Sequence, residues 1–570
     1  MATLTHLDLY KLGTLLDYPL SDRGLCHGVA LMAIQALLAV DEKSFFKRLD
    51  FIASYRSNFA RLKEEIEEAK KKALSTIPPI EEATQKLLDI LAFFDGIELY
   101  LVPQKHADLF DGVISQEDIT TIYPLISSEK LKGTKLTHLF NRPFAFDKTN
   151  LKDYLNELAN IFDDTTMFPP ILLRNIDHSI CLKYDKSDTW LYIDINDFGQ
   201  QENTTYFRNL NREELADNIF KSFGPAPYPH VVMNVEVLTT KENYLLQSAL
   251  EHLHAQHPIT AEQAKMHDHL HTGLLFLACR HGNLGVVQEL FQQPDALINT
   301  KTPNGETPLL IACAKGYLEI AQTLIAHRNT LVNESNLKKQ SPLSFACAKK
   351  YTKIAQALLE RRDTLVNEPN VIGETPLYIA CEYECHDIVL LLIAREDILV
   401  DQGNMDGVTP LCLISFVGRV DIAETLLQKA NINHPSYSGN TPFHYACASP
   451  DSPENPLMIQ LLLNRGASLT MQNEEEQTAL DIAFEWNNEI AISMLLEFTL
   501  ENGLAPDKVM SLDTFETRAP WLAENYPAFT GRMSQVKPQL KGRELSFFNH
   551  TPVGSEFIYD NTHENNMEKR

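Results

Sequence analysis

Short apolar runs recur at a near-constant spacing through the second half of the chain. Each run opens on Thr or Ser, then Pro or Ala, then a large apolar residue, and successive openings lie 34, 34, 34, 32 and 37 residues apart. Self-similarity at such a period is typical of a repeat protein. The openings stand at Thr307, Ser341, Thr375, Thr409, Thr441 and Thr478.

Each unit is predicted to contain two short helices. The Thr or Ser can cap the first helix, and proline suits the first helical position because its missing N–H would be unpaired there. Ile320–Ala326 shows the pattern of the second helix, and glycines such as Gly305 and Gly373 fit a turn with positive φ before the openings. Two further sets keep the 34-residue step: Cys279, Cys313, Cys347 and Cys381, and Asn299, Asn333, Asn367 and Asp401.

The unit Thr307–Ala326 reads TPLLIACAKGYLEIAQTLIA and resembles the ankyrin repeat. Counting the less regular units at the two ends, around Thr272–Phe291 and Gln477–Phe498, we expect seven repeats. The resemblance implies an all-α ankyrin-repeat solenoid over residues 272–500. It also implies a protein partner, held by the concave face and the hairpin tips.

The residues that contact this partner are expected at the hairpin tips, which vary freely from repeat to repeat. An insertion at Ser449–Pro456 lengthens a helix–helix turn in the sixth repeat, either as a specificity loop or as a tolerated insertion. The predicted contact residues are Lys338, Lys339, Met405 and Tyr437.

Residues 1–245 show no repeat and contain a strongly apolar helical segment. Val29–Val40 is apolar nearly all round, which is typical of a buried helix. Gly24 permits a sharp entry, so we expect Cys26 at the N-terminus of this helix. Unpaired N–H groups and the helix dipole stabilise a thiolate at such a position.

A β-hairpin is predicted farther along the chain. Ile176–Tyr184 and Thr189–Ile195 favour strands, and the polar stretch between them favours a turn. Antiparallel pairing can bring His178, at the start of one strand, beside Asp194, near the end of the next. Further predicted elements are a strand at His230–Val237 and surface helices at Leu62–Ala73 and Asn150–Phe162.

A cysteine at the start of a buried helix, followed by a histidine and an aspartate on a later hairpin, resembles the papain-like cysteine peptidases. The closest similarity is to bacterial effector proteases related to the Yersinia type III effector protease. The matching residues are Cys26 in GLCHG, His178 in DHSICLKY and Asp194 in WLYIDIND. The resemblance implies an α+β papain-like domain in which Cys26 attacks an acyl carbon, His178 holds the proton and Asp194 orients the imidazole.

The stretch before Cys26 departs from this family pattern. Family members supply Gln or Asn there as an oxyanion donor, whereas Leu20–Arg23 has no amide side chain. Losing one such donor costs about 10²–10³ in rate. Either Ser21 or a more distant residue takes this role, or the domain keeps the fold without turnover.

The charge balance narrows the classes of partner. With 50 basic and 76 acidic residues the formal net charge is −26, and such a surface repels phosphate backbones and anionic lipid. No apolar run approaches the roughly 18 residues that cross a bilayer, and Met1–His6 lacks the pattern of a secretory leader. We therefore expect protein partners, no direct nucleic-acid binding and no membrane insertion.

The nine cysteines, most of them inside repeats, are typical of free thiols in a reducing compartment.

Six histidines lie between His252 and His271. His267 and His271 are four residues apart and on a helix could share a metal, but no carboxylate pattern or cysteine completes a site. We interpret residues 246–271 as a His-rich helical connector. No metal and no cofactor are expected.

The C-terminal end is expected to be less regular. Residues 501–545 have modest helical content and are interpreted as a cap, and the polar residues 546–570 are expected to be disordered. Ankyrin repeats behind a cysteine-protease-like domain resemble the type IV secretion effectors of Legionella and its relatives, with a layout similar to the ankyrin H type. This resemblance implies a C-terminal secretion signal, transfer into a host cell, and a host protein as partner in the cytosol or the nucleus.

Two functional hypotheses follow from these features. In the first, the protein is an effector whose array binds a host protein while a protease-like domain acts on that target or helps to hold it. In the second, Cys26, His178 and Asp194 form an active triad that cleaves or modifies the bound protein. A third hypothesis, an ankyrin scaffold of a eukaryotic cell, offers no account of the three N-terminal residues.

Overall fold

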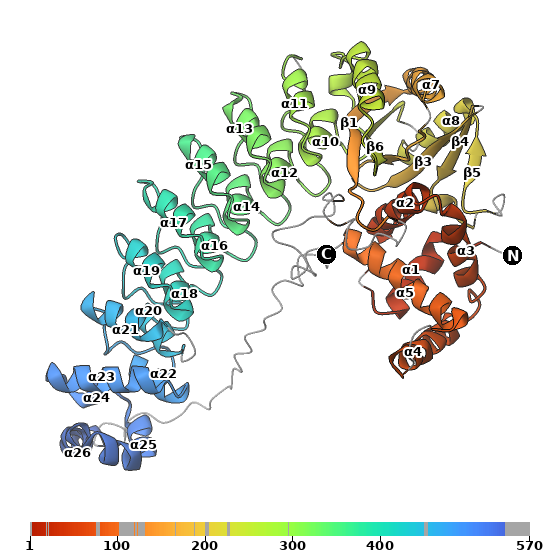
Figure 1. Cartoon of the computed structure of the whole chain (residues 1–570). Coiled ribbons are helices and arrows are strands. Elements are labelled where there is room, and N and C mark those ends of the chain that lie inside the picture. Colours follow the sequence, from red (N-terminus) through yellow and green to blue (C-terminus); the bar gives the residue numbers. More distant parts are fainter. Residues whose placement is uncertain are drawn as a thin grey trace. The chain divides into compact units, whose positions relative to one another are not determined.

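The computed structural model of the chain is drawn in Figure 1. It consists of two compact units, residues 1–398 and 399–570. The expected disordered tail at 546–570, Ser21, and residues 450–453 of the sixth-repeat insertion lie outside the described residues. The structure describes residues 3–18, 20, 22–75, 80–101, 119, 122, 131–165, 167–186, 188–199, 205–224, 228–293, 296–449 and 454–541.

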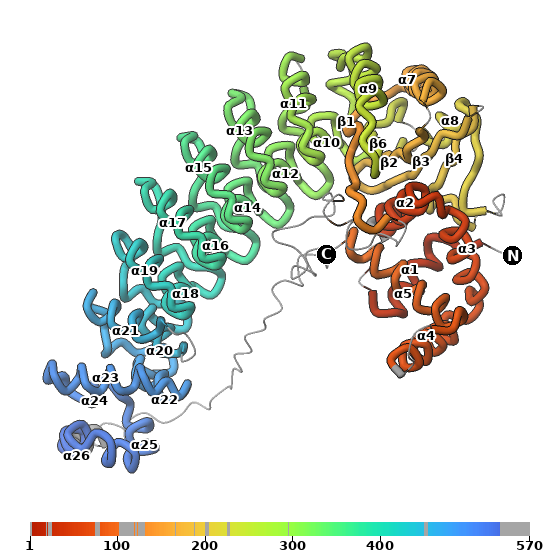
Figure 2. The backbone as a smooth tube through the Cα atoms, viewed as in Figure 1, coloured from red at the N-terminus to blue at the C-terminus, as the bar shows by residue number. Residues whose placement is uncertain are grey.

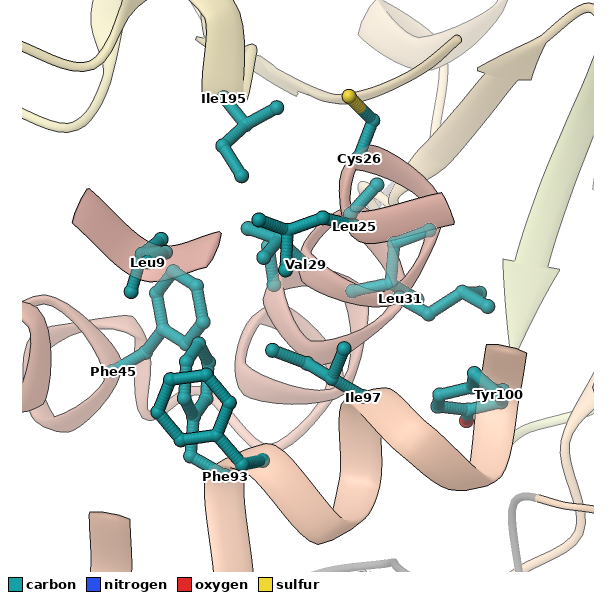
Figure 3. Close-up of a cluster of buried hydrophobic side chains, with 14 of the residues drawn as sticks. Leu9, Leu25, Cys26, Val29, Leu31, Phe45, Phe93, Ile97, Tyr100 and Ile195 are labelled. Carbon is teal, nitrogen blue, oxygen red and sulfur yellow. The ribbon is translucent and has the colours of Figure 1, made fainter. Parts of the chain in front are cut away.

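The first unit begins with a layer of helices around α2. Helix α2 is buried because its side chains are mostly apolar. Val29 of α2 packs with Phe93 and Ile97 of α5 in one hydrophobic core (Figure 3). Gly28 lets the two helices approach, because a Cβ there would lie 2.7 Å from Ile97 Cγ2. The layer consists of α1 (His6–Leu15), α2 (Asp22–Leu38), α3 (Glu42–Ala53), α4 (Phe59–Ser75) and α5 (Glu82–Leu101).

Six antiparallel strands form one sheet in the order β1-β6-β2-β3-β4-β5. Helices α7, α8 and α9 pack on one face, and α2 packs against β2 and β3 on the other. The strands are β1 (Thr137–Asp147), β2 (Ile171–Arg174), β3 (Ser179–Asp185), β4 (Thr189–Ile193), β5 (Arg208–Leu210) and β6 (His230–Thr239). The helices are α7 (Lys148–Asp163), α8 (Arg212–Phe223) and α9 (Tyr244–Gln256), with 3-10 turns η2 (Ile195–Asp197) and η3 (Gln263–Lys265).

The first repeat is packed against this sheet. Its helix α10 contacts β1 and β6, and Asn283 Nδ2 donates to Asn141 O of β1 at 2.7 Å. Arg142 of β1 forms an ion pair of 2.6 Å with Glu289 of α11. Because β1 is the last strand of the sheet, the first repeat covers an edge strand that would otherwise be open to another chain.

Four helix pairs belong to the first unit, and they follow one another as stacked hairpins (Figure 2). Thr307 caps α12 by accepting from Leu310 N at 3.1 Å, with Pro308 as the first helical residue. This is the arrangement that the Thr-Pro openings predict. The pairs are α10 (Leu274–Arg280) with α11 (Leu284–Leu290), α12 (Pro308–Lys315) with α13 (Leu318–Ala326), α14 (Pro342–Ala348) with α15 (Thr352–Glu360), and α16 (Pro376–Glu382) with α17 (His386–Ile393).

Three further pairs and a helical end make up the second unit. Thr478 caps α22 although Ala479 replaces proline, and its hydroxyl also donates to Val509 O at 2.6 Å, which ties the last repeat to the helices behind it. The pairs are α18 (Pro410–Val417) with α19 (Val420–Leu426), α20 (Pro442–Cys447) with α21 (Asn455–Asn464), and α22 (Ala479–Glu485) with α23 (Glu489–Glu501). The end helices are α24 (Pro506–Val509), α25 (Leu512–Asn525) and α26 (Pro527–Lys541).

The seven predicted helix pairs are confirmed, four in the first unit and three in the second, and the N-terminal region contains a small antiparallel sheet that includes the predicted hairpin. The papain-like fold itself stays a prediction. Two features differ from the sequence interpretation. Helix α2 begins at Asp22, so Gly24 lies inside it rather than before it. Helix α9 buries Leu246, Leu250 and Leu253 in the core that it shares with α7, α8 and the sheet, so this part of the predicted His-rich connector packs on the sheet.

Candidate thiol site

Helix α2 and the β3–β4 hairpin bring three predicted site residues together. Cys26 comes from α2, His178 immediately precedes β3, and Asp194 immediately follows β4. All three are buried, with 4%, 7% and 2% of their surface exposed. In Figure 3 the Cys26 sulfur points away from the packed side chains of the helical core. The Cys26 thiol is hydrogen-bonded to His178.

The hairpin register explains how His178 meets Asp194. Cys181 pairs with Ile193 and Leu182 with Tyr192, so the two strand ends that carry His178 and Asp194 lie side by side. His178 Nε2 is 3.0 Å from Asp194 Oδ1. The Asn175 side chain fixes the backbone at the strand start by accepting from His178 N at 2.9 Å.

Asp194 is held by donors on both of its carboxylate oxygens. Oδ1 accepts from Asn196 N at 2.9 Å in addition to His178. Oδ2 accepts from Tyr192 OH at 3.0 Å and from Ser222 Oγ at 2.7 Å. A buried carboxylate with this many donors stays ionised and orients the imidazole.

Residues next to Cys26 and His178 join α2 to β3. His27 Nδ1 and Ser179 Oγ, each next in sequence to a site residue, lie 3.2 Å apart and are both buried. The Phe223 ring packs on the His178 ring with their centroids 5.5 Å apart. These contacts hold α2 and the start of β3 together beside Cys26 and His178.

The charges of the site favour a thiolate and an imidazolium. Burial raises the pKa of Cys26, but hydrogen bonds from His178 and His6 outweigh burial and lower it. Burial lowers the pKa of His178, yet the charge and hydrogen bond of Asp194, followed by Cys26, raise it to about 10. For Asp194, burial raises the pKa, and His178, Ser222 and Asn196 N together lower it. An activated thiol of this kind attacks acyl carbons.

His6 is a residue of the site that the sequence interpretation missed. It is the first residue of α1, and its side chain is hydrogen-bonded to the Cys26 thiol. The available signal was Thr5 followed three residues later by Asp8, a capping box that starts a helix at His6. That signal predicts the helix but not that it meets Cys26.

The expected position of Cys26 at a helix N-terminus is corrected by the structure. Cys26 is the fifth residue of α2, one past the four N–H groups that a helix leaves without an internal acceptor. The dipole effect is confined to the first turn, so the imidazoles rather than the helix end stabilise the thiolate.

The other cysteines differ from Cys26 in their surroundings. All nine are free thiols and buried. Burial raises the pKa of seven of them: Cys181, Cys279, Cys313, Cys347, Cys381, Cys412 and Cys447. Cys181 packs in the hydrophobic core between the helical layer around α2 and the sheet.

The histidine-rich stretch has structural contacts. His269 Nε2 lies 3.6 Å from Asp177 Oδ2, and His230 Nε2 lies 2.6 Å from His267 O. Within the described ranges, no group of His, Cys, Asp and Glu has the arrangement of a metal site. Over the same ranges no helix has the length and apolar character to cross a membrane.

The predicted contact residues of the array lie at hairpin tips, as expected. In the first unit Lys339 is exposed, whereas Lys338 is half-buried and its carbonyl accepts from Val371 N of the next hairpin at 3.1 Å. In the second unit Met405 is 66% and Tyr437 is 73% exposed. Whether any of them touches a partner stays a prediction.

A match to a family model supports the repeat assignment. The family model described as "Ankyrin repeats (3 copies)" matches residues 275–370, 329–403, 362–436 and 395–473. The ankyrin domain of Bcl-3 is similar in structure, with 25% identity, a TM-score of 0.35, and coverage of 39% of this chain and 96% of that chain. The human ASB11 ankyrin domain has 25% identity and a TM-score of 0.33, with coverage of 39% of this chain and 97% of that chain. The ankyrin repeat protein EF0377 has 20% identity and a TM-score of 0.32, with coverage of 33% of this chain and 95% of that chain. No curated protein matches the sequence. Residues 275–473 are therefore ankyrin repeats, a fold that implies a protein partner.

Proposed function

We propose that this protein is a thiol-dependent hydrolase or acyl-transfer enzyme whose ankyrin array holds the protein on which it acts. The observation that carries the proposal is the Cys26 thiol hydrogen-bonded to a histidine that lies 3.0 Å from the buried Asp194. A structural cysteine needs no such partners, and the seven cysteines with raised pKa values have none that outweigh their burial.

The chemistry follows from this arrangement. The Cys26 thiolate attacks an acyl carbon and forms a carbon–sulfur bond, while the carbonyl electron pair moves to oxygen. When the carbonyl re-forms, the bond to the leaving group breaks and His178 gives its proton to that group. Water, or another nucleophile, then attacks the thioester as His178 takes its proton. The carbon–sulfur bond breaks, the product leaves, and the thiolate and imidazolium are restored.

The decisive experiment measures the rate of Cys26 alkylation by iodoacetamide as a function of pH. Peptide mapping separates Cys26 from the other thiols. We expect fast labelling well below pH 8 in the native protein, and labelling like that of an ordinary thiol in His178→Ala. His252→Ala, an exposed histidine on α9, is the control. Equal profiles for native protein and His178→Ala would refute an activated thiol.

A second candidate function is an adaptor that binds its target without turnover. Two observations favour it: no amide side chain precedes Cys26 in Leu20–Arg23, and only 4% of the Cys26 surface is exposed. An adaptor would bind its partner equally well after Cys26→Ser, and the partner would keep its mass. A change in the partner's mass that depends on Cys26 would exclude this alternative.

The setting we propose is the interior of a host cell, with a host protein as partner. The layout of a cysteine-protease-like domain ahead of ankyrin repeats supports this, as does the polar C-terminal stretch of residues 546–570. A translocation assay with a reporter fused to the full chain, and to the chain without residues 546–570, tests it. Transfer that does not change when these residues are removed would contradict a C-terminal signal.

A further inference from the structure

The segment before α1 is tied to the domain next to the site. Thr3 and Leu4 are buried. Leu4 N donates to Tyr206 OH at 3.4 Å, and Arg56 Nη1 donates to Thr3 O at 3.2 Å. The chain therefore reaches α1 along a fixed path.

The same segment lies against the loop that follows Asp194. Gly199 has φ +71°, and a Cβ on it would lie 2.6 Å from Thr5 Cγ2 and 3.1 Å from Leu4 O. Only glycine permits this approach. The start of the chain and the loop behind the triad aspartate thus pack directly on each other.

Helix α1 starts where these contacts place it. Thr5 Oγ1 accepts from Asp8 N at 3.1 Å, Asp8 Oδ2 accepts from Thr5 N at 2.9 Å, and Arg56 forms an ion pair of 2.7 Å with Asp8. His6 is therefore held at the first helical position, with its side chain on the Cys26 thiol.

The site needs a donor of this kind. An acyl-transfer site must stabilise the oxyanion that forms beside the sulfur. The stretch Leu20–Arg23 offers no amide side chain, and Cys26 lies past the helix N–H groups that are available to a ligand. Besides His178, the Cys26 thiol is hydrogen-bonded to the side chain of His6, which comes from a different element, α1.

We propose that His6 is the second donor of the site, supporting the Cys26 thiolate at rest and donating a hydrogen bond to the oxyanion once the sulfur has attacked. This inference rests on the proposed acyl-transfer function. It assigns to a residue of the N-terminal helix the role that a side chain before the cysteine has in the family that the domain resembles.

Two probes on the full-length protein separate the roles of His6. Iodoacetamide alkylates the thiolate without forming an oxyanion, whereas 4-nitrophenyl acetate acylates it through a tetrahedral oxyanion. The rates are compared above the thiol pKa, after subtracting the background of Cys26→Ser. In His6→Ala we expect acylation to fall by about 10², and alkylation to fall by a much smaller factor. His6→Gln, which restores a donor, should recover most of the acylation rate.

The controls keep structural and chemical effects apart. Leu7→Ala changes an exposed residue in the same turn of α1 (54% exposed) and should leave both rates unchanged. Thermal unfolding midpoints show whether each variant is folded. If His6→Ala slows both probes by the same factor, or leaves acylation unchanged, His6 is not an oxyanion donor. If the native protein itself shows neither activated alkylation nor acylation at Cys26, the proposed function fails and this inference with it.

Discussion

Asp194 accepts four hydrogen bonds, two on each carboxylate oxygen, from His178, Asn196 N, Tyr192 and Ser222. At the residue scale this carboxylate sets the protonation state of the site, because it is the main cause of the raised pKa of His178. Cys26, next to the imidazolium, then keeps its thiolate over a wide range of pH.

Asp194→Ala should therefore narrow the pH range of the reaction. The pKa of His178 is about 10 in the native protein, and without the carboxylate it should fall toward or below its ordinary value. The alkaline limb of the acylation rate, where the imidazolium loses the proton that the leaving group needs, should move down accordingly. A pH profile measured with an acyl 4-nitroanilide checks this, because its amine leaving group must take this proton. An unchanged alkaline limb would show that another group raises the pKa of His178.

The same pKa gives a prediction for stability. A pKa raised on folding contributes stability that is fully present below the unfolded value of about 6.5 and is lost as pH rises through the folded value. The native protein should thus have a higher free energy of unfolding than His178→Gln at low pH, and this difference should disappear between about pH 6.5 and 10. Urea unfolding of both proteins at several pH values measures this, and a difference that is constant with pH would contradict it.

At the element scale, a buried carboxylate joins the sheet to the first repeat. Glu236 of β6 is fully buried, with Arg174 Nε on Oε1 and His138 Nε2 at 2.9 Å from Oε2. His281, at the end of α10, lies 3.9 Å from Oε1. Burial raises the pKa of Glu236, but Arg174, followed by His138 and His281, outweighs burial and holds the pKa well below its usual range.

Glu236→Gln should be strongly destabilising. It leaves Arg174 buried without a counter-charge, which costs about 3–5 kcal/mol. Glu242→Gln, an exposed carboxylate beyond the end of β6, should change the free energy of unfolding by less than about 0.5 kcal/mol. Urea unfolding at neutral pH compares the two. Equal effects would mean that the Glu236 cluster contributes no more than a surface charge.

The periodic asparagines join each repeat to the next. Asn333 Nδ2 donates to Asp363 O at 2.6 Å, and Leu365 N donates to Asn333 Oδ1 at 2.9 Å. Asn299 and Asn367 make equivalent bonds to Asn329 O and Asp397 O. Asp401, at the same step, accepts from Asn431 N at 3.0 Å.

Asn333→Ala should cost about 1–2 kcal/mol, since it removes two bonds to the neighbouring hairpin. Asn333→Asp, the residue that position 401 carries naturally, keeps the acceptor and should cost less. Thermal unfolding of the two variants tests this order. A larger loss for the aspartate would show that donation to Asp363 O dominates.

At the scale of the whole chain, the sheet domain and the repeats are not independent. Asn283 and Glu289 bond Asn141 and Arg142 on edge strand β1. The residues one period later in the second repeat are Tyr317 and Thr323, which offer neither the amide nor the carboxylate. The first repeat is thus fitted to the sheet in a way that its neighbour is not.

A fragment of residues 1–271 should therefore behave differently from residues 1–398, the first compact unit. Without the first repeat, β1 is uncovered and Arg142 loses Glu289, so the shorter fragment should self-associate and unfold at a lower temperature. Light scattering and thermal unfolding measure both properties. A monomeric 1–271 with the thermal midpoint of 1–398 would contradict the dependence on the repeat.

Sequence patterns predicted what is local or periodic. The repeats follow from a 34-residue step, and the meeting of His178 with Asp194 follows from a short hairpin. Long-range pairing leaves no such pattern. Strand β1 pairs with β6 from Thr137 opposite Thr239, and no local period marks that partner. His6 was missed for the same reason, because its contact with Cys26 depends on how α1 packs.

The fit between the first repeat and the edge of the sheet sets limits on how this gene could be reshuffled. A crossover at the border between the sheet domain and the array would place a foreign repeat against β1. Arg142 would then stay buried without the carboxylate of Glu289. A crossover one period later carries Asn283 and Glu289 along with their partners. New binding specificities are therefore expected to arise by recombination after the first repeat, which descends with the sheet domain as a single heritable piece.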